Sequence, residues 1–389
     1  MNFVLIHYNE IALKGGNRAF FEAKLIENIK IQLGNELPAS FEFIKKISGG
    51  ILIKLNQTGI ENSFQIKEIL QKTFGIANFS FANKVSPEIE SLKQACWELL
   101  ENRDFDSFRV STTRSDKNYP LISEEINRLV GEHIFEKLSR KKAVGLKNPD
   151  LNIRINIFHD HALVFADKFS GLGGMPVATN GKVMCLISGG FDSPIAAWQL
   201  LKRGAQLRFV HFHSIPYTSK DSVKKIQAII KQLGKFQAAQ KTYLVPFADA
   251  QKEIMLKTPA KFRVILYRRL MLKIAQELAR RENCLALVTG DSLGQVASQT
   301  LENIHAVDQA ANMPVFRPLI GTDKEEIMQK AREIGTYEIS ILPHDDCCTR
   351  LMPKNPETRA RLEEVLEAEK TLDLPELTRN ILEKTELAN

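Results

Sequence analysis

The stretch CLISGGFDS, residues 185–193, constrains the fold more than any other part of the sequence. An apolar run predicts a strand that ends in Ser-Gly-Gly. A helix is predicted to begin almost at once, with Ser193 as its N-cap, Pro194 in its first turn and Gly204 at its end. A plain strand-to-helix turn would share these features. Because two glycines allow close backbone approach and a helix N-terminus attracts anions, the stretch also predicts a phosphate site.

The residues after 181 alternate between two kinds of pattern. Apolar, β-rich runs (VMCLI, LRFVHFH, TYLVPF and CLALVTG) are separated by helical stretches such as SPIAAWQLLKRG and KFRVILYRRLMLKIAQELARRE. Residues 356–389 are charged and helical in pattern. The alternation predicts a doubly wound parallel sheet with the glycine loop at the carboxyl end of one strand.

The part of the chain before residue 168 carries two α+β patterns. Residues 2–8 predict a strand, and a helix is predicted where Phe20, Phe21, Leu25 and Ile29 recur near helical spacing. The run GGILIKL then returns to strand. Further along, LNIRINIFHDHALVFAD alternates apolar and polar residues on either side of a turn at HDH, which predicts a hairpin.

Composition narrows the function classes only slightly. A net charge of +7 suits a polyanionic partner. Five cysteines, scattered and without a CxxC pair, predict neither a disulfide framework nor a metal site. No apolar run reaches the roughly 18 residues of a membrane span, and the N-terminus does not read as a secretory signal. These features predict a cytoplasmic protein without a membrane partner.

The glycine loop matches neither of two common nucleotide-binding patterns, because GxxxxGK[ST] and GxGxxG are both absent. SGGFDS instead resembles the pyrophosphatase loop (PP-loop) of ATP-dependent enzymes that adenylate a substrate and release pyrophosphate. The resemblance implies that the loop grips pyrophosphate and that Asp192 supports a phosphate and Mg²⁺ site. It therefore implies ATP and Mg²⁺ as cofactors and Asp192 as a catalytic residue.

Three further stretches narrow the resemblance to one family. YNEIALKGGNR, GGMPVATNGK and TGDSLGQVASQTLENI are similar to the tRNA 4-thiouridine synthetase family, known as ThiI, and FRVSTTRSDKNYP fits a THUMP domain. The resemblance covers nearly the whole chain and implies a multidomain α/β and α+β protein. Its expected parts are a ferredoxin-like domain (1–74), a THUMP RNA-binding domain (75–167), a linker (168–180) and a PP-loop adenylating domain with a doubly wound parallel sheet (181–389).

The family resemblance implies an activity. ATP would adenylate O4 of a uridine at position 8 of tRNA, and sulfur would then displace AMP to leave 4-thiouridine. The residues implied in ATP binding are Leu186, Ile187, Ser188, Gly189, Gly190, Asp192, Ser193, His211, Phe212, Arg268, Gly290 and Gln299. Outside the family context, Phe212 would be taken as core and Arg268 as a surface arginine.

The stretch PHDDCCTRLMP, residues 343–353, carries the cysteines that the resemblance implies for sulfur transfer. Cys347 is favoured as the catalytic thiol, with Cys348 as a second thiol that could close a transient disulfide. About 35 residues follow this stretch, so we expect no C-terminal rhodanese domain of the kind that longer family members carry. Sulfur is expected from outside, from a cysteine desulfurase or from sulfide.

Basic residues mark the expected tRNA contacts in the THUMP region. They are Arg114, Lys117, Arg140, Lys141 and Lys142. A run of charge is usually a solvated face, so this signal depends on the family context. The resemblance also implies a homodimer. Two alternatives stay open: another PP-loop tRNA-modifying enzyme of the 2-thiouridine or lysidine type, and an RNA-binding protein without catalytic activity.

Overall fold

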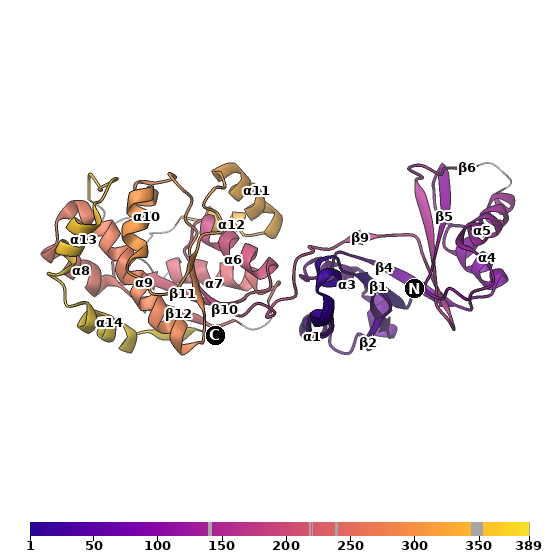
Figure 1. The fold of residues 1–389 in the computed structure, drawn as a ribbon, viewed down its shortest axis with the longest axis horizontal. Helices are drawn as coiled ribbons and strands as arrows, with labels where there is room; N and C mark the ends of the chain where they lie inside the picture. The colour runs from indigo at the N-terminus through magenta and orange to yellow at the C-terminus, as the bar shows by residue number, and fades with distance from the viewer. Residues whose placement is uncertain (139–141, 218, 220, 238–239, 344–352, 389) are drawn as a thin grey trace. The chain divides into compact units, whose positions relative to one another are not determined.

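The computed structural model divides the chain into two compact units, Met1–Met175 and Pro176–Asn389, each of which is considered separately (Figure 1). The division falls within the segment predicted as a linker, and the other domain boundaries stay predictions. The structure describes every residue except the following: 139–141, 218, 220, 238–239, 344–352 and 389. None of the described helices is long and apolar enough to cross a lipid bilayer.

The first unit is built on one sheet with strand order β2-β3-β1-β4-β8-β7-β5-β6, and β9 pairs with β4. Its strands are β1 Phe3–His7, β2 Phe41–Ile47, β3 Gly50–Leu55, β4 Asn78–Val85, β5 Ser107–Arg114, β6 Ala143–Val144, β7 Leu151–Ile157, β8 Ala162–Phe165 and β9 Phe169–Ser170. Its helices are η1 Glu10–Leu13, η2 Gly15–Asn17, α1 Arg18–Glu36, α2 Gln57–Glu61, α3 Ser63–Gln71, α4 Ile89–Glu98 and α5 Ser123–Lys137.

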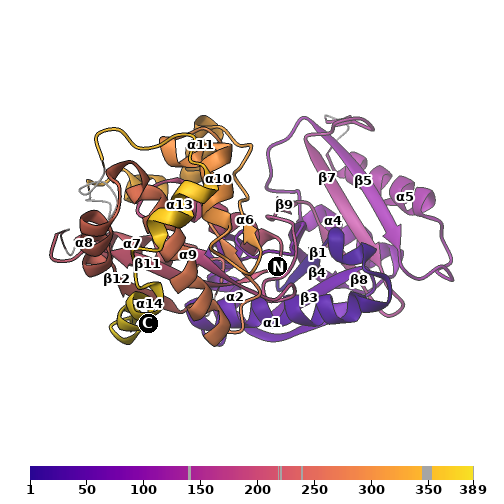
Figure 2. The same cartoon turned by 60° about the vertical axis from the view of Figure 1, so that its left-hand side comes forward.

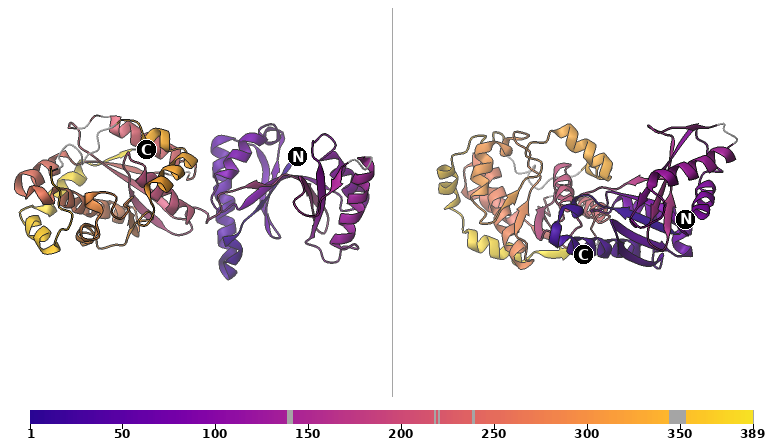
Figure 3. Two further views of the ribbon diagram at one scale, coloured as in Figure 1. Left: turned by 90° about the horizontal axis from the view of Figure 1, so that it is seen from above. Right: turned by 45° about the vertical axis from the view of Figure 1, so that its right-hand side comes forward.

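The described residues of this unit form three hydrophobic cores, two between the sheet and its helices and a third around Phe3, Leu5 and Phe165. The helices α1 and α3 pack on β1 and β3, where Leu25 and Ile29 are fully buried as their spacing predicts. The helices α4 and α5 pack on β5, β7 and β8 (Figure 3). The β7–β8 hairpin confirms the predicted turn at HDH. The sequence prediction missed β2, because this strand at the end of the sheet buries only Ile44 and exposes charged residues.

The second unit is built on a sheet with strand order β14-β13-β10-β11-β12-β15. Its strands are β10 Lys182–Leu186, β11 Gln206–His213, β12 Thr242–Pro246, β13 Ala286–Val288, β14 Val315–Phe316 and β15 Glu386–Ala388. Its helices are α6 Asp192–Lys202, α7 Asp221–Leu233, α8 Ala248–Lys257, η3 Ala260–Phe262, α9 Arg263–Arg281, η4 Ala297–Gln299, α10 Leu301–Asp308, α11 Lys324–Ile334, α12 Tyr337–Ser340, α13 Leu362–Glu369 and α14 Leu374–Glu383.

This sheet confirms the predicted parallel architecture, with one addition. The strands β10 to β14 pair in parallel, whereas β15 adds to β12 in the antiparallel direction. The prediction that residues 356–389 are helical is therefore only partly right, because β15 lies within them. The neighbouring residues Phe209 and Val210 of β11 point to opposite faces and are both buried, so helices cover both faces of the sheet. Figure 2 shows α9, α13 and α14 together on one of these faces.

A buried ion pair joins α13 to α9, in addition to the apolar contacts that pack both helices in one core. Arg269 of α9 donates from Nε and Nη2 to the two carboxylate oxygens of Glu369 at the end of α13, over 2.9 and 2.7 Å. Another guanidinium N–H donates to the Ala306 carbonyl. Arg269 therefore has a structural role and does not line the cavity described below, whereas its neighbour Arg268 does.

Replacing Glu369 with alanine is expected to destabilise the second unit by about 3–5 kcal/mol, because it leaves a buried guanidinium without its carboxylate. The chain has two tryptophans, Trp97 in the first unit and Trp198 in the second. Urea unfolding of the full chain in a Trp97→Phe background, followed by tryptophan fluorescence, therefore reports on the second unit alone. Glu367→Ala, which removes an exposed partner of Lys370 on the same helix, is the matched control. Equal shifts for both variants would contradict the assigned role.

Candidate active site

The site lies where the strand order of the second sheet reverses. From the central strand β10 the chain continues to β11 on one side, whereas β13 lies on the other side. The loops that leave these three strands therefore diverge at their carboxyl ends, which is where open α/β sheets bind ligands. The segments that meet there are residues 187–193 after β10, His211 and Phe212 at the end of β11, and residues 289–299 after β13.

Ser193 stabilises the glycine loop, although the sequence analysis predicts it as the N-cap of the following helix. The helix α6 begins at Asp192 with Phe191 as its N-cap, so the predicted N-cap role of Ser193 is wrong. The Ser188 N–H instead donates to Ser193 Oγ over 2.8 Å, which fastens the start of the loop to the first turn of the helix. The predicted helix end is confirmed, because Gly204 follows α6 with a positive φ of +83°.

Gly290 is the point where the third segment contacts the loop. A Cβ on Gly290 would lie 2.6 Å from Ser193 N and 2.8 Å from Asp192 C. No side chain fits there without displacing the start of α6. The backbone after β13 therefore packs directly on the first turn of the helix, and this close approach explains why the position holds glycine.

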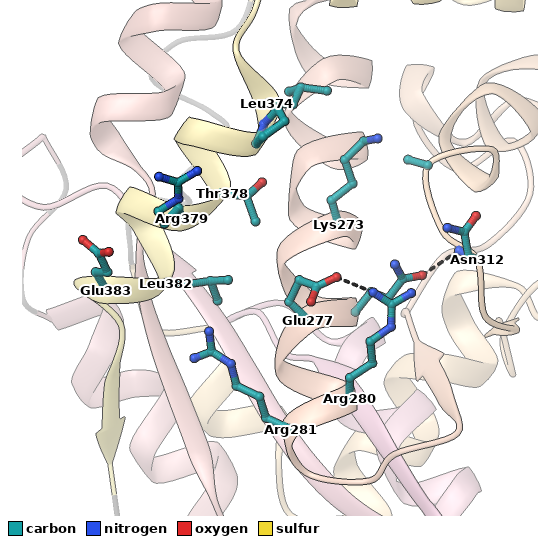
Figure 4. A pocket seen from close by; sticks show the side chains of 13 residues that line it. Lys273, Glu277, Arg280, Arg281, Asn312, Leu374, Thr378, Arg379, Leu382 and Glu383 are labelled. Atoms are coloured by element: carbon teal, nitrogen blue, oxygen red, sulfur yellow. Dashed lines mark hydrogen bonds and ion pairs between the residues drawn. The ribbon is translucent and has the colours of Figure 1, made fainter.

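A cavity of about 420 Å³ opens between these segments. Most of the residues predicted to bind ATP line it, and Gly189 is the exception, being a buried loop residue that is not part of the lining. The predicted residues in the lining are Leu186, Ile187, Ser188, Gly190, Asp192, Ser193, His211, Phe212, Arg268, Gly290 and Gln299. A larger depression of about 760 Å³ between α9 and α14 contains none of them (Figure 4).

Asp291 organises the positive charge at one side of the cavity. It accepts from Arg268 Nη2 over 2.5 Å and from Arg317 Nε over 3.0 Å, and Thr289 also donates to it. Burial alone would raise the pKa of Asp291, but the two guanidinium groups hold it below its ordinary value. The network turns Arg268 toward the cavity, so Arg268 is not the surface arginine that the sequence would suggest outside the family context.

Asp192 has the opposite electrostatic environment. Burial raises its pKa and the nearby Asp291 adds to the effect, whereas the hydrogen bond from Gln295 Nε2 (3.0 Å) and the charge of Lys324 oppose it. Asp192 therefore presents a partly desolvated carboxylate at the N-terminal end of α6. Such a group is poised to gain a cationic neighbour.

The remaining wall of the cavity is apolar and carries one open acceptor. Phe212, Val264, Ile265 and Met271 line this wall. Phe212 also belongs to the main hydrophobic core, so it serves as core and as wall. Gln299 Nε2 donates to Asp291 over 3.2 Å, and its buried Oε1 has no hydrogen-bond partner among the described residues. A flat apolar ligand with a donor at its edge would suit this wall.

The cysteines predicted to carry sulfur lie outside the described residues. Cys347 and Cys348 fall within 344–352, so their placement stays a prediction. Cys96, Cys185 and Cys284 are buried. Burial raises the pKa of Cys185 to about 12 and that of Cys284 to about 11, which makes thiolate chemistry at either position unfavourable. The described residues contain no group of His, Cys, Asp or Glu that could hold a metal ion by itself.

The basic residues predicted to contact RNA lie in different settings. Arg114 Nη1 donates to the Tyr119 and Leu121 carbonyls, which gives that side chain a structural role in the loop after β5. Lys117 is exposed. Lys142 lies 3.7 Å from carboxylates of both Asp104 and Asp106. Arg140 and Lys141 lie outside the described residues.

The sequence analysis missed several site residues, among them the polar and charged residues Asp291, Gln295, Arg317 and Lys324. Asp291 and Gln295 lie within a motif that it quoted, TGDSLGQVASQTLENI. A carboxylate directly after a buried strand was a usable signal for Asp291. Arg317 and Lys324 carry no local signal, because they reach this neighbourhood only through the fold.

The whole chain is similar to known proteins. Residues 178–374 match the family described as "Thiamine biosynthesis protein (ThiI)", residues 3–80 the ThiI ferredoxin-like domain and residues 87–167 the THUMP domain. A probable tRNA sulfurtransferase of Thermus thermophilus is 43% identical over 98% of this chain and 92% of its own. One from Thermoanaerobacter sp. is 41% identical over 98% of both chains.

A solved structure is similar along the full length. The crystal structure of a 4-thiouridine synthetase–RNA complex with bound ATP superposes with a TM-score of 0.91 and 35% identity, over 100% of this chain and 99% of that one. The protein PH1313 from Pyrococcus horikoshii has a TM-score of 0.66 at 22% identity, which shows a shared fold.

Asp192→Asn is expected to raise the melting temperature of the second unit at pH 7. The folded pKa of Asp192 is raised, so its ionisation disfavours the folded state. This penalty is absent below the ordinary carboxyl pKa of 3.8, grows as the pH rises from there to the folded pKa, and stays constant above it. Thermal scans at pH 7 and pH 3.5, followed by Trp198 fluorescence in the Trp97→Phe background, measure it. Asp221→Asn, an exposed position on α7, is the control. A lower melting temperature for Asp192→Asn at pH 7 would contradict the assigned environment.

Proposed function

The chain belongs to the ThiI family, and from that premise we propose that it is an ATP-dependent tRNA sulfurtransferase that makes 4-thiouridine at position 8 of tRNA. The observation that carries the proposal is the cavity at the strand-order reversal, lined by the PP-loop, Arg268 and an apolar wall. The similarity to relatives named tRNA sulfurtransferase supports the substrate class.

We propose one orientation for ATP, because the cavity has an apolar wall on one side and the glycine loop on another. The adenine base would lie against the apolar wall of Phe212, Ile265 and Met271, and the free Oε1 of Gln299 would accept from a donor on the base. The phosphates would then lie at the loop, where the N-terminus of α6 and its backbone N–H groups favour negative charge. Arg268, fixed by Asp291, adds a guanidinium on the side of the cavity between these ends.

Mg²⁺ is compatible with the residues present. Asp192 offers a half-buried carboxylate whose raised pKa shows that its charge is poorly compensated, and a divalent cation would compensate it. Mg²⁺ is commonly held by one or two carboxylates together with substrate phosphates, so a single protein ligand suffices. When bound, it would neutralise phosphate charge during adenylation.

The first step of the proposed reaction needs charge stabilisation more than acid–base chemistry. Uridine O4 attacks the α-phosphorus of ATP, the bond to pyrophosphate breaks, and the products are adenylated uridine and pyrophosphate. Bound phosphates would meet the loop N–H groups and Arg268, which Asp291 already holds in place. Such preorganised donors are the condition for electrostatic stabilisation of the transition state. The O4 atom becomes part of a good leaving group, AMP.

The second step replaces AMP by sulfur. A persulfide carried on Cys347, or sulfide itself, attacks C4 of the adenylated uridine, and AMP leaves with the former O4. If a persulfide attacks, the transferred sulfur is still bonded to Cys347, and a second thiol must cleave that sulfur–sulfur bond. Cys348 is proposed for this role. The cleavage leaves a disulfide between Cys347 and Cys348, which a reductant later opens. The sulfur donor is proposed to be a cysteine desulfurase or sulfide. We also propose a cytoplasmic homodimer whose exposed Lys117 and nearby basic residues contact tRNA phosphates.

Purified protein given unmodified tRNA, ATP, Mg²⁺ and sulfide is expected to form 4-thiouridine, detected by mass spectrometry of the digested tRNA. Asp192→Ala is expected to lower the rate by about 100-fold or more, because it removes the carboxylate beside the phosphates. Gln240→Ala, on the same unit and outside the cavity lining, is the control. Product at another uridine or none with the wild-type protein would contradict the proposed function.

The carrier role of the cysteines is tested with a cysteine desulfurase and cysteine as the sulfur source. Cys347→Ser is expected to abolish thiolation while pyrophosphate release continues, because adenylation needs no thiol. Cys284→Ser, a buried position, serves as the control for removing a cysteine. Full activity of the Cys347→Ser, Cys348→Ser double variant would show that neither thiol carries sulfur.

A further inference from the structure

A buried lysine outside the nucleotide cavity holds the chain just before the cysteine stretch. Lys225 lies on α7, and its side chain is almost wholly buried, with 5% of the residue exposed. Its Nζ donates to the carbonyl oxygens of Ser340 and Leu342, both over 2.7 Å. These carbonyls lie at the end of α12, where a helix has no internal donors left for its last carbonyls.

The same short helix is fixed to the PP-loop from its other side. Ser340 Oγ donates to the Gly190 carbonyl over 3.3 Å. The rings of Phe191 and Tyr337 stack with centroids 5.3 Å apart and an interplanar angle of 27°. The helix α12 therefore bridges α7 and the loop that is proposed to grip pyrophosphate, and Lys225 provides its attachment to α7.

This attachment limits where the sulfur-carrying thiol can go. Cys347 follows Leu342 by five residues in the sequence. A trans chain extends at most about 3.6 Å per residue, so the Cα atom of Cys347 must lie within about 18 Å of that of Leu342. Any movement of Leu342 away from the loop would shift this whole range away from the adenylated base.

The choice of lysine supports a specific role. Burying an ammonium group is unfavourable unless hydrogen bonds compensate it, and an apolar side chain would fill the same space without that cost. The two carbonyls that Lys225 binds are separated by one residue and belong to the exit of α12. The contact therefore fixes the direction in which the chain leaves the helix, which packing alone would leave free.

We infer that Lys225 is a positioning residue for the sulfur-transfer step. The inference rests on the proposed function, because it assumes that Cys347 delivers sulfur to a base activated at the PP-loop. Lys225 does not line the nucleotide cavity, so it has no direct part in adenylation. Its removal should therefore separate the two half-reactions.

The test compares Lys225→Met with Lys224→Met in single-turnover reactions with tRNA, ATP, Mg²⁺, cysteine and a cysteine desulfurase. Lys224 is the neighbouring, exposed lysine on the same helix. For Lys225→Met, pyrophosphate release should stay within about 3-fold of wild type, whereas 4-thiouridine formation should fall by about 100-fold, the typical cost of misplacing a reacting group by about 1 Å. Lys224→Met should match wild type in both. Lys225→Arg, which keeps donors for the two carbonyls, should restore part of the thiolation.

Two outcomes would overturn the inference. If pyrophosphate release and thiolation fall together, Lys225 supports the whole unit and not the sulfur step. If neither falls, the contact has no role in catalysis. Should Lys225→Met fail to fold, as a thermal scan would show, Lys225→Gln takes its place with the same readouts, because its amide retains a donor. A wild-type protein that makes no 4-thiouridine would instead contradict the proposed function.

Discussion

The contact between the backbone of Gly290 and the first turn of α6 is the constraint on which the site depends. A Cβ at that position would come within 2.6 Å of Ser193 N, so the segment after β13 lies as close to the helix as a peptide chain can. That approach places Asp291 and Gln299, which follow β13, beside the PP-loop, which follows β10. Because β10 lies between β11 and β13, the loops that follow these strands diverge and leave an opening, and the Gly290 contact limits how wide that opening is.

The charges of the site follow from its burial. Asp291 keeps its charge in a buried position only because two guanidinium groups contact it, and in return it fixes the direction of Arg268. Arg317 extends the network by a bidentate pair with Asp308 on α10. Asp192 has no guanidinium partner among the described residues. The side of the cavity with fixed positive charge and the side with a poorly compensated carboxylate therefore exist before any nucleotide binds.

The sequence predicted this site through features that are local in the chain. The SGGFDS loop, the strands that flank it and the glycine after β13 all lie in short motifs, and the structure brings them together. Ser193 was assigned wrongly because its hydroxyl bonds Ser188 across the loop and does not cap the helix. Arg317 could not be predicted, since 26 residues separate it from its partner Asp291. The strands β2 and β15 were missed because few or none of their residues are buried, so their sequences lack a continuous apolar run. They form strands because they pair with a neighbouring strand.

The PP-loop has two faces, and they serve the two halves of the proposed reaction differently. One face lines the nucleotide cavity, where Ser188, Gly190 and Asp192 are exposed to a ligand. On the other face, the Gly190 carbonyl and the Phe191 ring contact α12. The chain leaves α12 toward the cysteine stretch. A change in the loop on binding phosphate would therefore act directly on the helix that precedes the thiol, and Lys225 resists that displacement from α7. The helix α12 is therefore one physical link between the two parts, because it contacts the PP-loop and directly precedes the cysteine stretch in the sequence.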